Sequence, residues 1–198
     1  MENIKKFRLL VFASGRGSNF NAIATAIENK QLTNVEIVAL VSNKKNAPAL
    51  EVAIDHKIPA HVIASNQYFT DGKFDRPRYE KELIDFAKKM EPDWIILAGY
   101  MLILGKEFIQ EFSGKILNIH PSLLPKYKGM DAQKQALEAG EKETGCTVHI
   151  VTEEMDAGPI VAQSKVQIYP EDTVETLTLR LLPQEHATYV SAIKKLCH

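Results

Sequence analysis

Short apolar runs alternate with segments of helical periodicity along most of the 198-residue chain. Short runs that are apolar on both faces are typical of strands in a parallel sheet covered by helices on each side. The pattern predicts seven strands, at residues 7–13, 35–41, 61–63, 94–98, 115–119, 147–151 and 160–166. Their alternation with helices predicts a doubly wound α/β fold, a mostly parallel seven-stranded sheet with helices on both faces.

Apolar positions recur at helical spacing between these runs. The predicted helices span residues 19–29, 47–55, 78–90, 106–112, 132–139 and 173–193. Before the last of them, Asp172 and Glu175 have the spacing of a capping box, and Pro183 should kink or divide that helix. The polar stretch 65–77 predicts a surface loop at the rim of a site. We expect residues 1–198 to form a single catalytic domain.

Composition narrows the class of protein. The chain is 45% hydrophobic and 25% charged, as in ordinary globular proteins, and its formal net charge is −1. Because the charges balance and no long basic run occurs, a nucleic-acid partner is disfavoured. Cys146 and Cys197 lack CxxC spacing, which favours a reducing, cytoplasmic setting. The first apolar run is too short for a signal peptide or a membrane span, so no membrane association is expected.

The sequence ASGRGSN, residues 13–19, separates the first predicted strand from the first predicted helix. A dinucleotide fingerprint would need a third glycine where Phe20 stands, and a P-loop would need a lysine where Ser18 follows Gly17. A glycine loop before a helix still favours a compact anion, so a phosphate monoester is the better candidate. The alternative is a simple tight turn, with Ser18 or Asn19 as the helix N-cap.

Asn118 and His120 lie at the end of the fifth predicted strand and face the same side, because strand side chains alternate. An amide can donate to a developing oxyanion and an imidazole can carry a proton, so the pair suits attack on a carbonyl carbon. Asp156 lies in the turn after the sixth strand, where its carboxylate could orient His120 and favour its protonated form. Two alternatives stay open: a histidine bonded only to backbone, and an aspartate that only caps its turn.

Other features narrow the chemistry. His149 lies in the sixth predicted strand, either as a core histidine or near the site. The apolar, glycine-containing segment 97–105 suits packing or a slot for a flat ring. The six histidines show no ligand spacing with cysteine or glutamate, and no GxSxG elbow occurs. The predicted chemistry is therefore acid–base and electrostatic, without a metal or a covalent nucleophile.

Four motifs together resemble the folate-dependent phosphoribosylglycinamide formyltransferases, also called glycinamide ribonucleotide transformylases. In chain order they are SGRGSN, LNIHPSLLP, GCTVHIVTEEMDAGPI and QEHATYV. The resemblance covers nearly the whole chain and implies the Rossmann-like fold of these enzymes. It also implies a one-carbon transfer in purine biosynthesis, from 10-formyltetrahydrofolate as co-substrate to the amine of 5′-phosphoribosylglycinamide.

The resemblance implies a role for each matching residue. His120 would be the general acid, Asn118 the oxyanion donor and Asp156 the partner of His120. The ribonucleotide substrate would bind at Gly17, Ser18, Asn19 and Glu185. The folate would bind at Arg76, Met101, Leu102, Ile103, Leu104 and Asn118, with His149 in support.

Some positions and some related families qualify this resemblance. Leu102 and Asp131 stand where some members have arginine and histidine, so the resemblance says less about folate contacts at these positions.

Two related families share the core of this resemblance. Methionyl-tRNA formyltransferases normally carry an added C-terminal RNA-binding domain, and formyltetrahydrofolate deformylases usually carry an N-terminal regulatory domain. A non-catalytic sugar-phosphate or folate sensor is a third alternative, disfavoured by the complete catalytic set. The expected partners are small molecules, bound by a monomer or homodimer.

Overall fold

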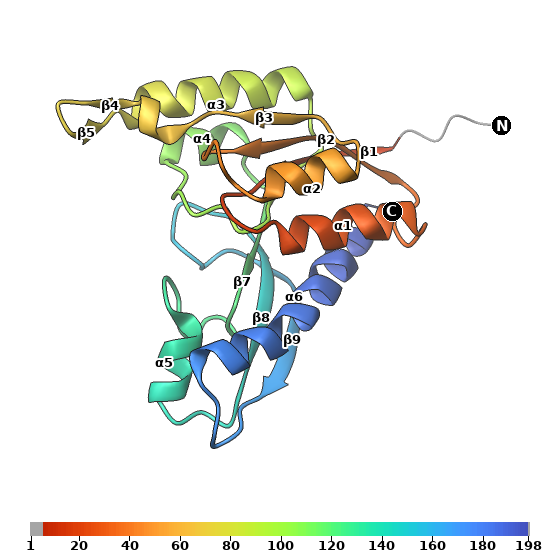
Figure 1. Ribbon diagram of the computed structural model, residues 1–198, viewed down its shortest axis with the longest axis vertical. Helices are drawn as coiled ribbons and strands as arrows, with labels where there is room; N and C mark the ends of the chain where they lie inside the picture. The colour runs from red at the N-terminus through yellow and green to blue at the C-terminus, as the bar shows by residue number, and fades with distance from the viewer. Residues whose placement is uncertain (1–5, 198) are drawn as a thin grey trace.

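A seven-stranded sheet forms the centre of the computed structural model, which describes residues 6–197 (Figure 1). Its strands are β1 Phe7–Phe12, β2 Val35–Ser42, β3 Ala60–Val62, β6 Trp94–Leu97, β7 Ile116–His120, β8 Glu143–Ile150 and β9 Ile160–Gln167. The order is β3-β2-β1-β6-β7-β8-β9, and the pairs are parallel as far as β7 and antiparallel beyond it. The predicted mostly parallel seven-stranded sheet is confirmed.

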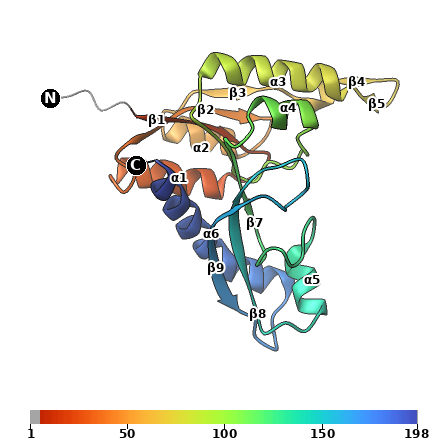
Figure 2. The ribbon, with the colours of Figure 1, turned by 180° about the vertical axis from the view of Figure 1, so that it is seen from behind.

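Six α-helices accompany the sheet within the described residues. They are α1 Ser18–Glu28, α2 Ala49–Asp55, α3 Arg76–Met90, α4 Lys106–Glu111, α5 Ala132–Glu138 and α6 Val174–Leu196. Their bounds lie within three residues of the predicted ones. Figures 1 and 2 show the helices from opposite sides of the molecule.

Alternation along β1 explains how both faces of the sheet are covered. Leu9 and Val11 pack in a core cluster with residues of α1, α2 and α6, whereas Leu10 and Phe12 pack with residues of α3 and α4. All four side chains are fully buried. A strand that is apolar at every position therefore places helices on both faces, as the sequence pattern predicts.

The start of α6 differs from the prediction. Its capping box lies one residue later than predicted: Thr173 is the N-cap and exchanges hydrogen bonds with Thr176. Asp172 instead accepts from Tyr169 N and pairs with Arg180. The helix continues through Pro183 without a break, so of the predicted kink or division, the division does not occur.

The predicted surface loop at 65–77 contains a short 3-10 helix, η1 Ser65–Gln67, and a hairpin of β4 Phe69–Thr70 and β5 Lys73–Phe74. Asp71 and Gly72 connect the two strands, and both have positive φ. This is the geometry of a type I′ turn, for which Asp-Gly is a favoured sequence. The hairpin projects beyond α3 at one end of the molecule (Figure 1).

Candidate active site

Asn118 and His120 lie near the carboxyl end of β7, opposite two residues of β8. Asn118 is paired with His149, and His120 with Thr147. Side chains of directly opposed residues lie on the same face of a sheet. Accordingly, Asn118 Nδ2 lies 3.2 Å from His149 Nε2, and His149 Nδ1 lies 3.2 Å from the carbonyl oxygen of Ile150. The structure therefore brings His149 into the cluster that the sequence predicts around Asn118 and His120.

Asp156 reaches this cluster from the turn between β8 and β9. Its Oδ2 lies 3.3 Å from His120 Nδ1, and its Oδ1 lies 3.5 Å from His149 Nε2. Oδ2 also accepts a hydrogen bond of 2.9 Å from the amide of Gly129. Asp156 has a φ of 49°, a left-handed conformation that surrounding contacts must hold in place. The aspartate is thus more than a cap for its own turn.

Opposing effects act on the pKa of Asp156. Burial raises it, but the contact with His149, the Gly129 amide and the charge of His120 together outweigh burial and hold the pKa of this carboxyl below its ordinary value. The group is therefore anionic at neutral pH. It supplies a fixed negative charge beside both imidazole rings.

His120 is 5% exposed and faces an oxygen atom with each ring nitrogen. Nε2 lies 2.8 Å from the carbonyl oxygen of Tyr127, while Nδ1 faces Asp156. A cationic imidazole carries a hydrogen on both nitrogens and would donate to both acceptors. The site thus places a hydrogen-bond acceptor beside each ring nitrogen of His120. Neither Tyr127 nor Gly129 was found by sequence reasoning, because each contributes a backbone atom.

The glycine loop leads directly into the N-terminus of α1. Gly17 is the N-cap, with a φ of 77° and no side-chain cap among the described residues, so the alternative with Ser18 or Asn19 as N-cap is wrong. A Cβ on Gly17 would lie 2.7 Å from Ala49 Cβ, so only glycine fits here. Because the first N–H groups of a helix favour an anion, the loop can hold a phosphate.

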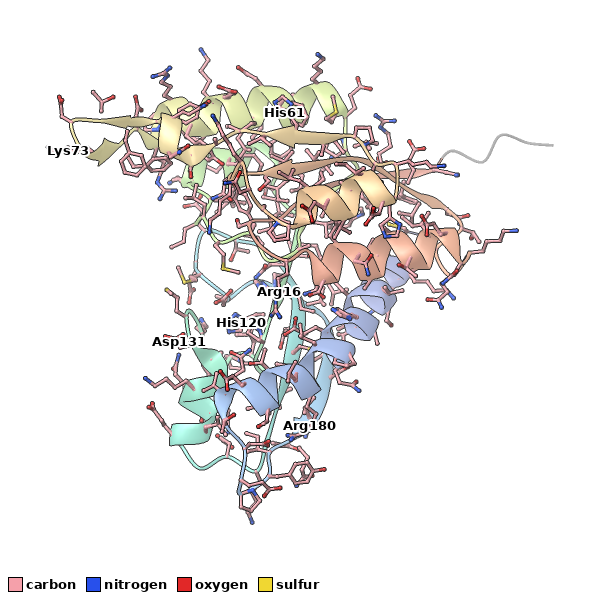
Figure 3. The ribbon with its side chains drawn as sticks, viewed as in Figure 1. Arg16, His61, Lys73, His120, Asp131 and Arg180 are labelled. Atoms are coloured by element: carbon pink, nitrogen blue, oxygen red, sulfur yellow. The ribbon has the colours of Figure 1, made fainter. Side chains whose placement is uncertain are left out.

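Glu185, which is 8% exposed, joins α6 to this loop through a hydrogen bond of 3.0 Å from Asn19 Nδ2 to its Oε2. Burial raises the pKa of the Glu185 carboxyl, although the bond from Asn19 and the charge of Arg16 oppose the shift. Arg16 is exposed and has no hydrogen bond or ion pair within residues 6–197. Sequence reasoning overlooked this arginine, although it lies between the two loop glycines. In the view of Figure 3, Arg16 and His120 are both labelled in the region between α1 and α5.

The predicted folate segment runs from the end of β6 toward α4. Met101 and Ile103 are 73% and 61% exposed, whereas Leu104 is 7% exposed and packs in the core. A ligand would therefore meet residue 104 mainly through its backbone. Arg76 contacts the carbonyl oxygen of Ile103 and so lies beside the segment, and its contact with folate stays a prediction.

Within residues 6–197, no group of three or more His, Cys, Asp or Glu residues is placed to hold a metal ion. Independence of metal remains a prediction. In the same part of the chain, no helix combines the length and apolar character needed to span a bilayer.

The sequence pattern of the formyl transferase family matches residues 7–193. The chain belongs to the formyl transferase family. The family resemblance predicted from the motifs is thus confirmed, and the cluster of Asn118, His120 and Asp156 lies within the matched region.

Named relatives of this formyl transferase fall into two groups by length. The trifunctional purine biosynthetic protein adenosine-3 of Chironomus tentans is 45% identical over 193 residues, 97% of this chain but only 14% of that protein. The phosphoribosylglycinamide formyltransferase of Bacillus subtilis (strain 168) is 42% identical over 193 residues, 98% of this chain and 95% of that protein. The formyl transferase chain therefore spans a small part of its trifunctional relatives and nearly all of the bacterial one.

A solved structure supports the same fold. Glycinamide ribonucleotide transformylase 1 from Geobacillus kaustophilus is 40% identical and superposes with a TM-score of 0.89, covering 98% of this formyl transferase and 100% of that chain. The α/β fold predicted from the apolar runs is therefore shared with a structure of related sequence.

Proposed function

We propose that this formyl transferase moves the formyl group of 10-formyltetrahydrofolate to the amine of 5′-phosphoribosylglycinamide. The products are formylglycinamide ribonucleotide and tetrahydrofolate. The cluster of Asn118, His120 and Asp156 at the end of β7 carries the proposal. The names of the bacterial relative and of the solved structure support the choice of substrate.

The catalytic step follows from what the cluster can donate and accept. The amine attacks the formyl carbon, and the carbonyl electron pair moves onto the oxygen. The amide of Asn118 and the cationic ring of His120 stabilise this oxyanion, which is the role of donors preorganised in a buried site. One proton then moves from the amine to the departing folate nitrogen, relayed by His120 and Asp156. The oxyanion's electron pair re-forms the carbonyl as the bond from carbon to the folate nitrogen breaks, which releases tetrahydrofolate.

Two further parts of the site are proposed to hold the substrates. The N-terminus of α1, at Gly17, Ser18 and Asn19, would bind the phosphate, and Glu185 would accept hydrogen bonds from ribose hydroxyls. The segment from Met101 to Leu104 would bind the folate, with Arg76 and Asn118 beside it. His149 would support the orientation of Asn118, which it contacts at 3.2 Å.

Purified protein with both substrates tests this proposal directly. Absorbance should report tetrahydrofolate formation from 10-formyltetrahydrofolate only after 5′-phosphoribosylglycinamide is added. His120→Ala should lower kcat by about a hundredfold or more, because a positioned acid–base group contributes at least that much. His61→Ala is a matched control, since His61 stacks on Phe86 on the far edge of the sheet.

Other outcomes would contradict the proposal in distinct ways. Turnover with water alone would indicate a deformylase, and turnover only with methionyl-tRNA would indicate the related tRNA formyltransferase. Folate binding without turnover on any of these acceptors would indicate a sensor.

A further inference from the structure

Glu80, on α3, is a buried carboxylate outside the catalytic cluster. The residue is 3% exposed, and buried carboxylates are rare in proteins unless they are paired and hydrogen-bonded. Its Oε1 accepts a hydrogen bond of 2.6 Å from the amide of Gly105 and lies 3.0 Å from Arg76 Nη1. Both partners border the proposed folate segment, so the carboxylate links α3 to that segment.

The contact between Glu80 and Gly105 requires a glycine for reasons of space. A Cβ at Gly105 would lie 2.5 Å from Glu80 Oε2 and 2.6 Å from Oε1. Such distances are far inside van der Waals contact, so any other residue would push the segment and the carboxylate apart. The backbone conformation at Gly105, with a φ of −84°, is ordinary.

Arg76 closes a ring of contacts around this carboxylate. Its Nη1 pairs with Glu80 and also donates to the carbonyl oxygen of Ile103. Two backbone groups, the Ile103 carbonyl inside the segment and the Gly105 amide directly after it, are thus held by one ion pair of α3. At the other end, the amide of Met101 donates to Ser14 Oγ at 2.8 Å.

The segment depends on these contacts because it lies between β6 and α4, outside both elements. Side chains of Met101 and Ile103 extend into solvent, so its shape is set mainly through its backbone. We propose that Glu80 is a positioning residue that sets the affinity for the folate co-substrate, acting through Arg76 and Gly105. This inference rests on the proposed function, because that proposal assigns folate to the segment.

Glu80→Gln tests the charge at constant shape. The glutamine oxygen can still accept from Gly105, but the charge that pairs with Arg76 is lost. We expect the KM for 10-formyltetrahydrofolate to rise about tenfold, which corresponds to the low end of the free energy that a hydrogen bond to a charged group contributes. The KM for 5′-phosphoribosylglycinamide and kcat should stay within about twofold, because the glycine loop and His120 are untouched.

Gly105→Ala is a second variant that moves the segment without changing any charge, and it should give the same split between the two KM values. Glu111→Gln is the matched control. It removes the ion pair of 2.9 Å between Lys88 on α3 and Glu111 on α4, which joins the same two helices away from the segment. Both KM values should be unchanged in this control.

Three results would overturn the inference: an unchanged folate KM in folded Glu80→Gln, an equal rise in both KM values, or a loss confined to kcat. Calorimetric titration with tetrahydrofolate decides the matter independently of turnover. A wild-type protein that binds tetrahydrofolate but never formylates the ribonucleotide refutes the proposed function alone. A Glu80→Gln protein that binds tetrahydrofolate as tightly as wild type refutes the role of Glu80 alone.

Discussion

Replacing Asp156 with asparagine should separate the charge of this residue from its shape. Asparagine keeps the side-chain size and one oxygen that can accept from the Gly129 amide. It removes the negative charge that lies 3.3 Å from His120 Nδ1. Every other contact of His120, including that with the Tyr127 carbonyl, can remain.

The distance sets the size of the expected effect. Two unit charges 3.3 Å apart attract by about 5 kcal/mol at an effective dielectric of 20, before the cost of burying them is subtracted. If about half of this attraction stabilises the transition state, kcat falls by roughly a hundredfold, since each 1.4 kcal/mol is about a factor of ten. This loss falls within the rate contribution of a positioned acid or base, which is roughly 10²-fold to 10⁴-fold.

Steady-state kinetics at neutral pH are the assay. We expect kcat of Asp156→Asn to fall by about a hundredfold. Glu154→Gln is the matched control, because Glu154 lies on the same turn and, among residues 6–197, forms an ion pair only with Lys128, while its side chain is 75% exposed. A kcat within about threefold of wild type in Asp156→Asn would refute the reasoning, because the ion pair would then contribute under about 1 kcal/mol.

Three further predictions concern stability and substrate binding. The pKa of Asp156 in the folded protein lies below its ordinary value, so the ionised carboxylate stabilises the fold above that ordinary value, and this contribution is lost as the pH falls through the folded-state pKa. In urea unfolding, the difference in free energy of unfolding between wild type and Asp156→Asn should therefore shrink below about pH 4. Gly17→Ala should lower the free energy of unfolding by about 1–3 kcal/mol, because its φ is 77° and its Cβ would meet Ala49; an unchanged melting temperature would contradict this. Arg16→Ala should raise the KM for 5′-phosphoribosylglycinamide about fivefold while leaving the folate KM unchanged. A ribonucleotide KM equal to that of wild type would show that the arginine does not face the phosphate.

The fold was largely predictable from the sequence, because a strand that is buried on both faces is apolar at every position. Leu9, Leu10, Val11 and Phe12 are apolar in succession, and the structure divides them between two cores. The signal fails where a strand is polar. The start of β8 at Glu143 lies four residues before the predicted strand, because its first residues pair with β9 without an apolar run.

The positions of the candidate site residues relative to one another were predictable only where the residues lie on the same strand. Asn118 and His120 share a face by alternation, which any strand guarantees. The approach of Asp156 depends on how the turn after β8 folds back, and Gly158 permits this by packing its Cα against the Ile150 carbonyl, where a Cβ would lie 1.8 Å away. The carbonyl of Tyr127 leaves no trace in a residue pattern, because every residue has one.

Different elements support the three proposed parts of the site, and this has a kinetic consequence. The β7–β8 pair and the turn carrying Asp156 hold the catalytic cluster. The N-terminus of α1 and the Asn19–Glu185 bond to α6 form the phosphate and ribose part, whereas Glu80 on α3 holds the folate segment. Asp156, Arg16 and Glu80 themselves share no hydrogen-bond partner in the described residues, although Ser14 of the glycine loop accepts from the Met101 amide, so we expect the effects of changing these three residues to be close to additive. Changes at Asp156, Arg16 and Glu80 should therefore act separately on kcat, on the ribonucleotide KM and on the folate KM.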